Sequence, residues 1–114
     1  MDRTQLHLLR GTVDLLILKS LSWGPKHGYA VSEWIEAVTD GTLLLEEGTL
    51  YPALHRLENK EVIEAEWGTS SNNRKAKFYR LTADGRGRLT REAEAWGRYS
   101  EAIAKALAAA TPNP

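Results

Sequence analysis

The stretch EEGTLYPALHRLE, from Glu46 to Glu58, decides the fold, because it has the pattern of a short helix with two different faces. Its leucines recur at the three- and four-residue spacing that puts side chains on one side of a helix. These leucines are Leu50, Leu54 and Leu57. The other side carries Gly48, Pro52, His55, Arg56 and Asn59. We therefore expect this helix to pack on one side and to offer the other side to a partner.

Two strand patterns follow this helix. Val62–Trp67 reads VIEAEW and Ala76–Leu81 reads AKFYRL, and the polar turn GTSSNNRK separates them. Short runs of this composition on either side of a polar turn are typical of a β-hairpin. A helix followed by a hairpin with a basic tip is the order found in a winged helix-turn-helix that binds DNA.

Two further helices are expected before this unit. The first covers roughly Thr4–Leu21. Its segment Leu15–Leu18 is apolar on all sides, so we expect this helix to be buried on two sides. One side should face the core of the domain, and the other should face another subunit. Its other regularly spaced apolar residues are Leu6, Leu9 and Val13. The second helix covers about Gly28–Val38. A turn at Thr39–Gly41 and a brief strand at Thr42–Leu45 should lead into the helix of Glu46–Glu58.

The C-terminal stretch has the heptad spacing of a helix that packs along a partner. The residues of this stripe are Leu89, Ala93, Trp96, Ser100, Ile103, Leu107 and Ala110. Too little chain follows Leu81 to cover so long a stripe, so we expect a second subunit to bury it. The predicted dimer contacts are Leu89, Trp96, Ile103 and Leu107. A two-fold axis would then place two DNA-reading helices about 34 Å apart, one turn of DNA.

Composition narrows the class of protein. The 114 residues suit one winged-helix domain (1–82), a dimerisation helix (83–110) and a short tail (111–114). The absence of cysteine excludes disulfides and thiolate zinc sites. The first 20 residues lack the order of a signal peptide, and Asp14 and Lys19 interrupt their apolar run, so we expect a cytoplasmic protein without a membrane partner.

Charge is balanced overall but segregated along the chain. There are 15 basic and 15 acidic residues, yet the segment Arg74–Arg88 carries six basic residues and only one acid, Asp84. One surface can therefore be positive although the net charge is zero. Arg86 and Arg88 are equally consistent with a DNA-contacting surface and with a solvated face.

Several motifs then resemble one family. The string LLRGTVDLLILKSLSWGPKHGYAVSEWIE, followed by EEGTLYPALHRLENKEVIEAEW and KFYRLTADGR, is similar to the PadR family of bacterial transcriptional regulators from about Leu8 to Leu107. The chain resembles the short subfamily, which has a single C-terminal dimerisation helix. This resemblance implies a mainly α fold with a small β-hairpin, a winged helix-turn-helix, and a homodimer on an inverted-repeat operator, often with ATGT/ACAT-like ends. It further implies repression of nearby transport or detoxification genes. Glu61 stands where the family usually has a glycine, and a glycine there would favour a left-handed conformation at the helix end.

The candidate DNA-binding residues lie on the exposed helix and at the hairpin tip. Thr49, His55 and Arg56 are candidates for contacts to base edges, although His55 is equally consistent with a solvated surface residue. Tyr51 is expected at a phosphate, a role that the resemblance also implies, and the alternative is a half-buried tyrosine packed on the first helix. Phosphate contacts are expected from the hairpin residues Arg74, Lys75 and Lys77. A weaker phosphate site is the helix start at His27, Gly28 and Tyr29, where Tyr29 could equally be core.

A second candidate site lies on the C-terminal stripe. Trp96 is bordered by small residues, so it either fills a void in the dimer or forms one wall of a flat slot. The resemblance implies that a planar aromatic effector can stack there, with Ala93 and Tyr99 as secondary contacts. The alternative is a tryptophan that only packs the dimer.

The sequence contains no recognisable catalytic motif. There is no GxSxG motif and no Gly-rich phosphate loop, and His7, His27 and His55 lie in separate elements without the spacing of metal ligands. We therefore expect no catalysis, no cofactor and no metal. The remaining alternative is a winged-helix protein-interaction module, which needs apolar residues on the exposed helix.

Overall fold

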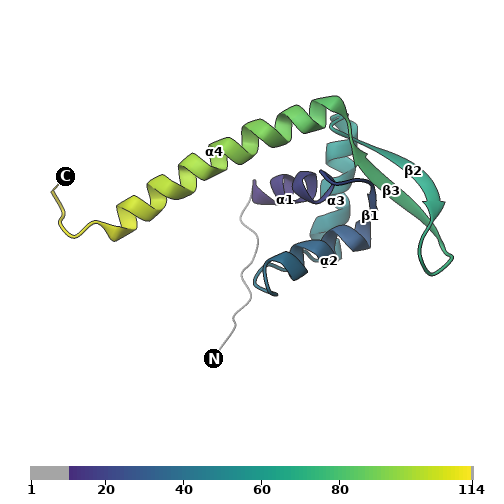
Figure 1. The fold of residues 1–114 in the computed structure, drawn as a ribbon, viewed down its shortest axis with the longest axis horizontal. Coiled ribbons are helices and arrows are strands. Elements are labelled where there is room, and N and C mark those ends of the chain that lie inside the picture. Colours follow the sequence, from purple (N-terminus) through teal and green to yellow (C-terminus); the bar gives the residue numbers. More distant parts are fainter. Residues whose placement is uncertain (1–10, 114) are drawn as a thin grey trace.

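The computed structural model describes residues 11–113, and it is mainly helical with a small sheet, as expected (Figure 1). In chain order the elements are α1 (Thr12–Ser20), β1 (Lys26–His27), α2 (Gly28–Val38), α3 (Glu47–Asn59), β2 (Ile63–Thr69), β3 (Lys75–Leu81) and α4 (Ala83–Ala108). The wing, which we define as β2, β3 and the turn between them, projects from the three-helix body on the side away from the end of α4 (Figure 1).

The three helices of the body share one apolar core. Their fully buried side chains are Ile17 and Leu18 of α1, Val31 and Ile35 of α2, and Leu50, Leu54 and Leu57 of α3. The predicted buried stripe of the helix of Glu46–Glu58 is therefore confirmed. Of the predicted first helix, Thr4–Arg10 lies outside the described residues, with Leu6 and Leu9, and the helix that is described begins at Thr12.

The three strands form an antiparallel sheet in the order β1-β3-β2. The strand expected at Thr42–Leu45 is wrong, because only an isolated bridge residue, Leu43, occurs there. Its backbone N–H donates to the Thr39 hydroxyl at 3.1 Å and is therefore taken by a side chain. The third strand is instead β1, in which Lys26 faces Tyr79 of β3.

A tight junction joins α3, β2 and α4. The N–H of Val62 donates to the carbonyl of Leu57 at 3.2 Å, and the N–H of Glu61 donates to the carbonyl of Glu58 at 2.9 Å. Both bonds define a Schellman motif, whose left-handed residue is Glu61 with φ 60°. Thr82 then caps α4 by accepting from the N–H of Gly85 at 3.0 Å, and its hydroxyl donates to the Glu61 carbonyl at 2.7 Å.

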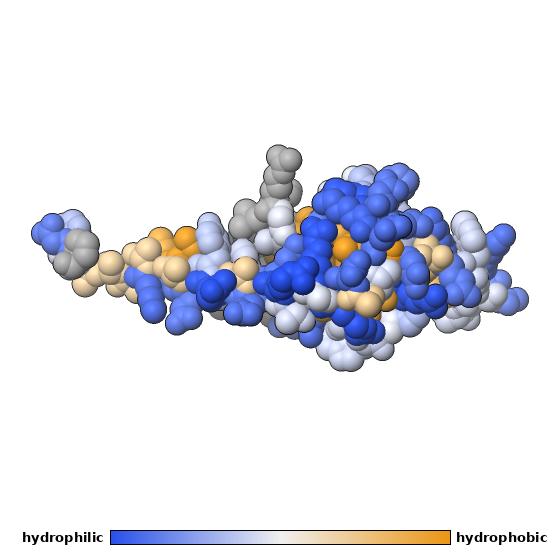
Figure 2. Space-filling model, turned by 90° about the horizontal axis from the view of Figure 1, so that it is seen from above, coloured by the Kyte–Doolittle hydropathy of each residue, from blue (hydrophilic) through white to orange (hydrophobic). Residues whose placement is uncertain are grey.

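The long helix α4 starts against the body and then leaves it (Figure 1). Leu89 packs against the chain's own core, whereas Trp96, Ile103 and Leu107 are exposed. Figure 2 shows hydrophobic residues gathered along the outer part of this helix. Ala110, the last residue of the predicted stripe, lies beyond the helix end at Ala108. Among the described residues, no helix is long and apolar enough to span a membrane.

Candidate nucleic-acid interface

The exposed face of α3 carries small and polar side chains, and it is continuous along the helix. Its exposed members include Gly48, Thr49, Pro52, His55 and Asn59, while the opposite face is buried in the core. The helix begins at Glu47, and Pro52 lies in its second turn on the solvent side. Water can therefore reach the carbonyl that loses its usual backbone donor at the proline.

Tyr51 lies on the edge of this face that is nearest the start of α2. Its side chain remains 46% exposed. A Cβ atom on Gly28 would lie 2.9 Å from the Tyr51 ring, so any other residue there would push against the tyrosine in its present position. Next to it, His27 caps α2, because its Nδ1 atom accepts from the N–H of Ala30 at 3.1 Å. The segments His27–Tyr29 and Gly48–Tyr51 therefore lie next to each other.

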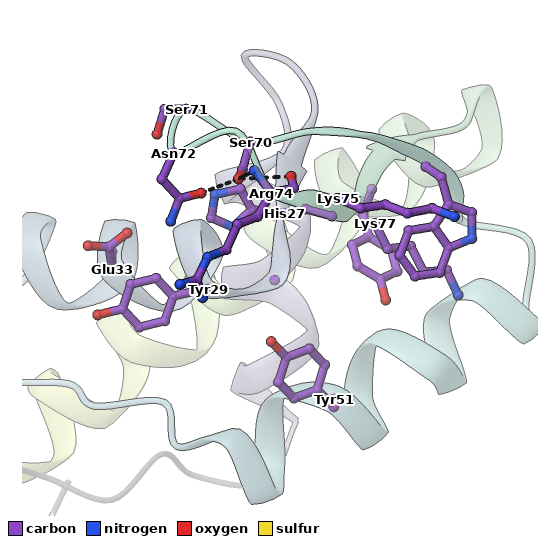
Figure 3. Close-up of a pocket in the computed structure, with 14 residues that line it drawn as sticks. His27, Tyr29, Glu33, Tyr51, Ser70, Ser71, Asn72, Arg74, Lys75 and Lys77 are labelled. Atoms are coloured by element: carbon purple, nitrogen blue, oxygen red, sulfur yellow. Dashed lines mark hydrogen bonds between the residues drawn. The ribbon is translucent and has the colours of Figure 1, made fainter.

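An open groove of about 530 Å³ separates these helix residues from the wing (Figure 3). The helix side of the groove is formed by His27, Gly28, Tyr29, Glu33 and Tyr51. The wing side is formed by Trp67, Ser70, Ser71, Asn72, Arg74, Lys75, Ala76, Lys77 and Tyr79. The structure thus brings four predicted DNA-binding residues to one groove, since Tyr51 faces the three basic residues of the wing.

The basic side chains of the wing differ in how they are held. Lys77 pairs with Glu58 of α3 at 3.3 Å, and the ammonium group of Lys75 lies 5.1 Å from the ring centre of Trp67. Arg80 is neutralised by Glu64 at 2.7 Å and Glu66 at 3.6 Å. Within the described part of the chain, no carboxylate pairs with Arg74 or Lys75. Arg74 and Lys75 therefore carry uncompensated positive charge at the wing tip.

One further groove residue, Tyr79, is buried and has a raised pKa. Desolvation raises the pKa of Tyr79 above its ordinary value of 10, and the nearby Glu58 adds to this effect while Lys77 opposes it. The Tyr79 phenol, which is protonated at physiological pH even at its ordinary pKa, therefore stays protonated to a still higher pH.

Three predicted residues of α3 lie outside this groove. Thr49 and His55 are exposed on the same helix. The guanidinium of Arg56 points to the other flank, where it donates to the Asp14 carboxylate of α1 at 2.5 Å. The contact of Arg56 with a base edge stays a prediction.

The sequence pattern did not single out Trp67, and it left Tyr29 open between a phosphate site at the helix start and the core. Both are exposed groove residues, so the interpretation of Tyr29 as a core residue is wrong. Trp67 is the last residue of the pattern VIEAEW and stands directly before the polar turn, and this position beside the basic tip was the available signal.

The second candidate site, on α4, consists of two exposed aromatic rings. Trp96 and Tyr99 lie with ring centres 5.9 Å apart and an angle of 30° between their planes. Ala93 is exposed one turn earlier. In residues 11–113, no group of three or more His, Asp or Glu side chains could hold a metal ion.

Comparison with known proteins assigns the fold to a family. The model of the transcriptional regulator PadR-like family matches residues 17–91. An uncharacterized protein of Lysinibacillus sphaericus is 36% identical over 96 residues, which cover 84% of this chain and 88% of that protein.

Solved structures agree. A transcriptional regulator from Clostridium thermocellum has a TM-score of 0.76 at 33% identity, over 84% of this chain and 93% of that one. A PadR-like transcriptional regulator from Bacillus cereus has a TM-score of 0.76 at 28% identity, over 89% of this chain and 96% of that one. This chain therefore belongs to the PadR-like family of transcriptional regulators, and it is a DNA-binding regulator with a winged helix-turn-helix fold.

Proposed function

We propose that this protein is a homodimeric repressor that binds an inverted-repeat operator and controls nearby transport or detoxification genes. The observation that carries this proposal is the groove between α3 and the wing. Tyr51 of α3 and the start of α2 line one side of this groove, next to the exposed polar face of α3, and Arg74 and Lys75, whose charges are uncompensated, line the other side. Major-groove contacts from a helix and phosphate contacts from a wing need this arrangement.

Each DNA-binding residue has a role in this proposal. Thr49 and His55 read base edges from the exposed face of α3, and Arg56 does so with the guanidinium donors that Asp14 leaves free. Tyr51 donates its phenolic proton to a phosphate. Arg74, Lys75 and Lys77 neutralise phosphates along the strand that the wing follows.

Dimerisation is proposed through α4. Trp96, Ile103 and Leu107 are 41%, 42% and 82% exposed, and they share one side of a helix that extends away from the body. Such a row of large apolar residues marks a protein contact. Leu89 packs on the chain's own core, and it would join the interface at its inner end.

An aromatic effector is a second proposal for the same helix. The near-parallel rings of Trp96 and Tyr99 offer a flat surface on which a planar compound can stack, with Ala93 leaving space beside them. Such a ligand would release the repressor by changing the relation between the two copies of α4.

The competing function is a winged-helix protein-interaction module. It would require an apolar surface on α3, but the exposed residues of that helix include Thr49, His55 and Asn59. The groove favours DNA, because its wing side is basic.

Selection of bound sequences from random duplex DNA tests the proposal. We expect an inverted repeat whose half-sites lie about one DNA turn apart, because a two-fold dimer presents two copies of α3 at that spacing. His55→Ala should weaken the selected site by about 1–3 kcal/mol and random DNA much less. Failure to enrich any sequence would contradict the function, and a non-palindromic site would contradict the dimer.

A further inference from the structure

An ion-pair cluster joins α3 to α4 through one side chain of α1. We call Asp14, Arg56, Arg88 and Glu92 the Asp14 cluster. Asp14 Oδ1 accepts from Arg56 Nη2 at 2.5 Å, and Asp14 Oδ2 lies 3.7 Å from Arg88 Nη2. Arg88 also donates from its Nε to Glu92 at 2.8 Å. The two oxygens of one carboxylate thus hold arginines from two different helices.

The Asp14 cluster is partly withdrawn from water. The Asp14 side chain is 14% exposed and that of Arg88 24%, whereas Arg56 is 48% exposed. Ion pairs between exposed side chains contribute little, but a carboxylate withdrawn from water depends on its partners. Asp14 is therefore held between Arg56 of α3 and Arg88 of α4. Arg56 is the most exposed member of the cluster, and it belongs to the helix that we propose to face DNA.

The position of Arg56 on α3 gives the cluster its relation to DNA. Arg56 directly follows His55 of the exposed face, and it lies on the flank opposite Tyr51. On the Tyr51 flank, Glu58 pairs with Lys77 of the wing at 3.3 Å. The helix is consequently fixed on one flank by the wing and on the other by Asp14, and these two contacts oppose rotation of α3 about its axis.

We infer that Asp14 is a positioning residue for DNA binding, which ties the orientation of α3 to the position of α4 by holding Arg56 and Arg88 at once. This inference rests on the proposed function of α3 in reading DNA. A movement of α4 that draws Arg88 away removes one of the two arginines that fix the Asp14 carboxylate, so the flank of α3 that Asp14 holds through Arg56 is fixed less firmly. The DNA-reading surface therefore senses the arrangement of the helix that carries Trp96 and Tyr99.

Asp14→Asn provides the main test, because electrostatics and positioning predict opposite signs. Removing a negative charge beside the DNA-binding surface should on its own strengthen binding to any DNA. Loss of positioning should instead weaken the selected operator, by about tenfold or more, within the range usual for coupling between sites. We expect the operator to be weakened and random DNA to be unchanged or bound more tightly. Glu101→Gln removes an equally charged but 69% exposed carboxylate from α4, and it should change neither affinity.

Arg88→Gln tests the connection to α4 separately. Its matched control is Arg86→Gln, which removes the same charge from the same turn and breaks only a 3.5 Å bond from Arg86 to the Ser22 carbonyl. We expect Arg88→Gln to weaken operator binding about tenfold relative to Arg86→Gln, again within the usual range for coupled sites. Asp14→Asn combined with Arg88→Gln should cause no further loss, because both changes break one network.

The outcomes separate the inference from the proposed function. If the parent protein selects no DNA sequence, the proposed function fails. If the parent binds its operator and both Asp14→Asn and Arg88→Gln bind it equally well, only the inference fails. Equal losses on operator and random DNA would also overturn it, because they indicate a damaged fold, which circular dichroism would reveal. Should Asp14→Asn not fold, the comparison of Arg88→Gln with Arg86→Gln decides.

Discussion

At the end of α3, a glutamate adopts a backbone conformation that favours glycine. Glu61 has φ 60° and forms the left-handed residue of the Schellman motif that leads into β2. The resemblance to the PadR family pointed to this position, because the family usually has a glycine where this chain has Glu61, and glycine favours a left-handed helix end. A side chain in this region costs about 1–2 kcal/mol. A hydrogen bond from the Thr82 hydroxyl to the Glu61 carbonyl helps to hold this left-handed conformation.

Glu61→Gly should therefore stabilise the protein. Glycine adopts the left-handed region without steric cost, so we expect a gain of about 0.5–1 kcal/mol after its greater freedom in the unfolded chain is counted. Urea denaturation measures this change. Glu61→Ala removes the carboxylate but keeps the strain, and it should give no such gain; equal effects of both variants would assign the change to charge.

Gly85→Ala should have the opposite effect. A Cβ atom at this position would lie 1.9 Å from the Val62 carbonyl oxygen, which is rigid backbone inside the junction of β2 and α4. We expect a loss of about 1–3 kcal/mol or more, as for other overpacked sites. Gly48→Ala is the control, because it meets nothing within 4 Å and should gain up to about 1 kcal/mol from helix propensity. A neutral Gly85→Ala would contradict the close approach.

Among the elements, those with a local sequence pattern could be predicted and those made by distant contacts could not. α2 and the wing strands follow from periodicity, and α3 follows from its leucines and the exposed residues between them. β1 has only two residues, Lys26 and His27, and exists because β3 lies beside it. The site shows the same limit. The basic wing tip was visible in the sequence, whereas the Arg56 contact with Asp14 joins residues 42 positions apart.

The contribution of the wing to DNA binding can be tested separately from that of α3. Arg74→Ala combined with Lys75→Ala should weaken binding to all DNA sequences similarly, because phosphate contacts carry no sequence information. The slope of log K against log salt should fall by about 0.9 for each phosphate that the variant no longer neutralises. Titrations at several salt concentrations measure it. Arg80→Gln, which removes a charge already paired with Glu64 and Glu66, should leave the slope nearly unchanged. An unchanged slope in the double variant would remove the wing tip from the interface.

At the scale of the whole molecule, the shape itself points to a partner. The described part of the chain measures 59 × 37 × 22 Å, and much of its length is α4, whose outer part packs on no other described residue (Figure 1). The core of the body is formed by the other helices and the sheet. α4 therefore contributes little to folding of the body beyond its first turns, and its apolar residues remain available for a second copy.

Ile103→Glu combined with Leu107→Glu should separate the two subunits without unfolding the body. Each side chain contributes about 1.5 kcal/mol or more when buried, so the pair should weaken the dimer by at least about 3 kcal/mol, more than about 100-fold in its dissociation constant. Analytical ultracentrifugation measures this change. Ala102→Glu with Ala108→Glu adds the same charges on other sides of α4, and this control should remain dimeric. The monomeric variant should keep its random-DNA affinity per subunit but lose preference for the inverted repeat, because that preference requires two linked copies of α3. A variant that stays dimeric, or a parent that is already monomeric, would place the dimer contact elsewhere or remove it.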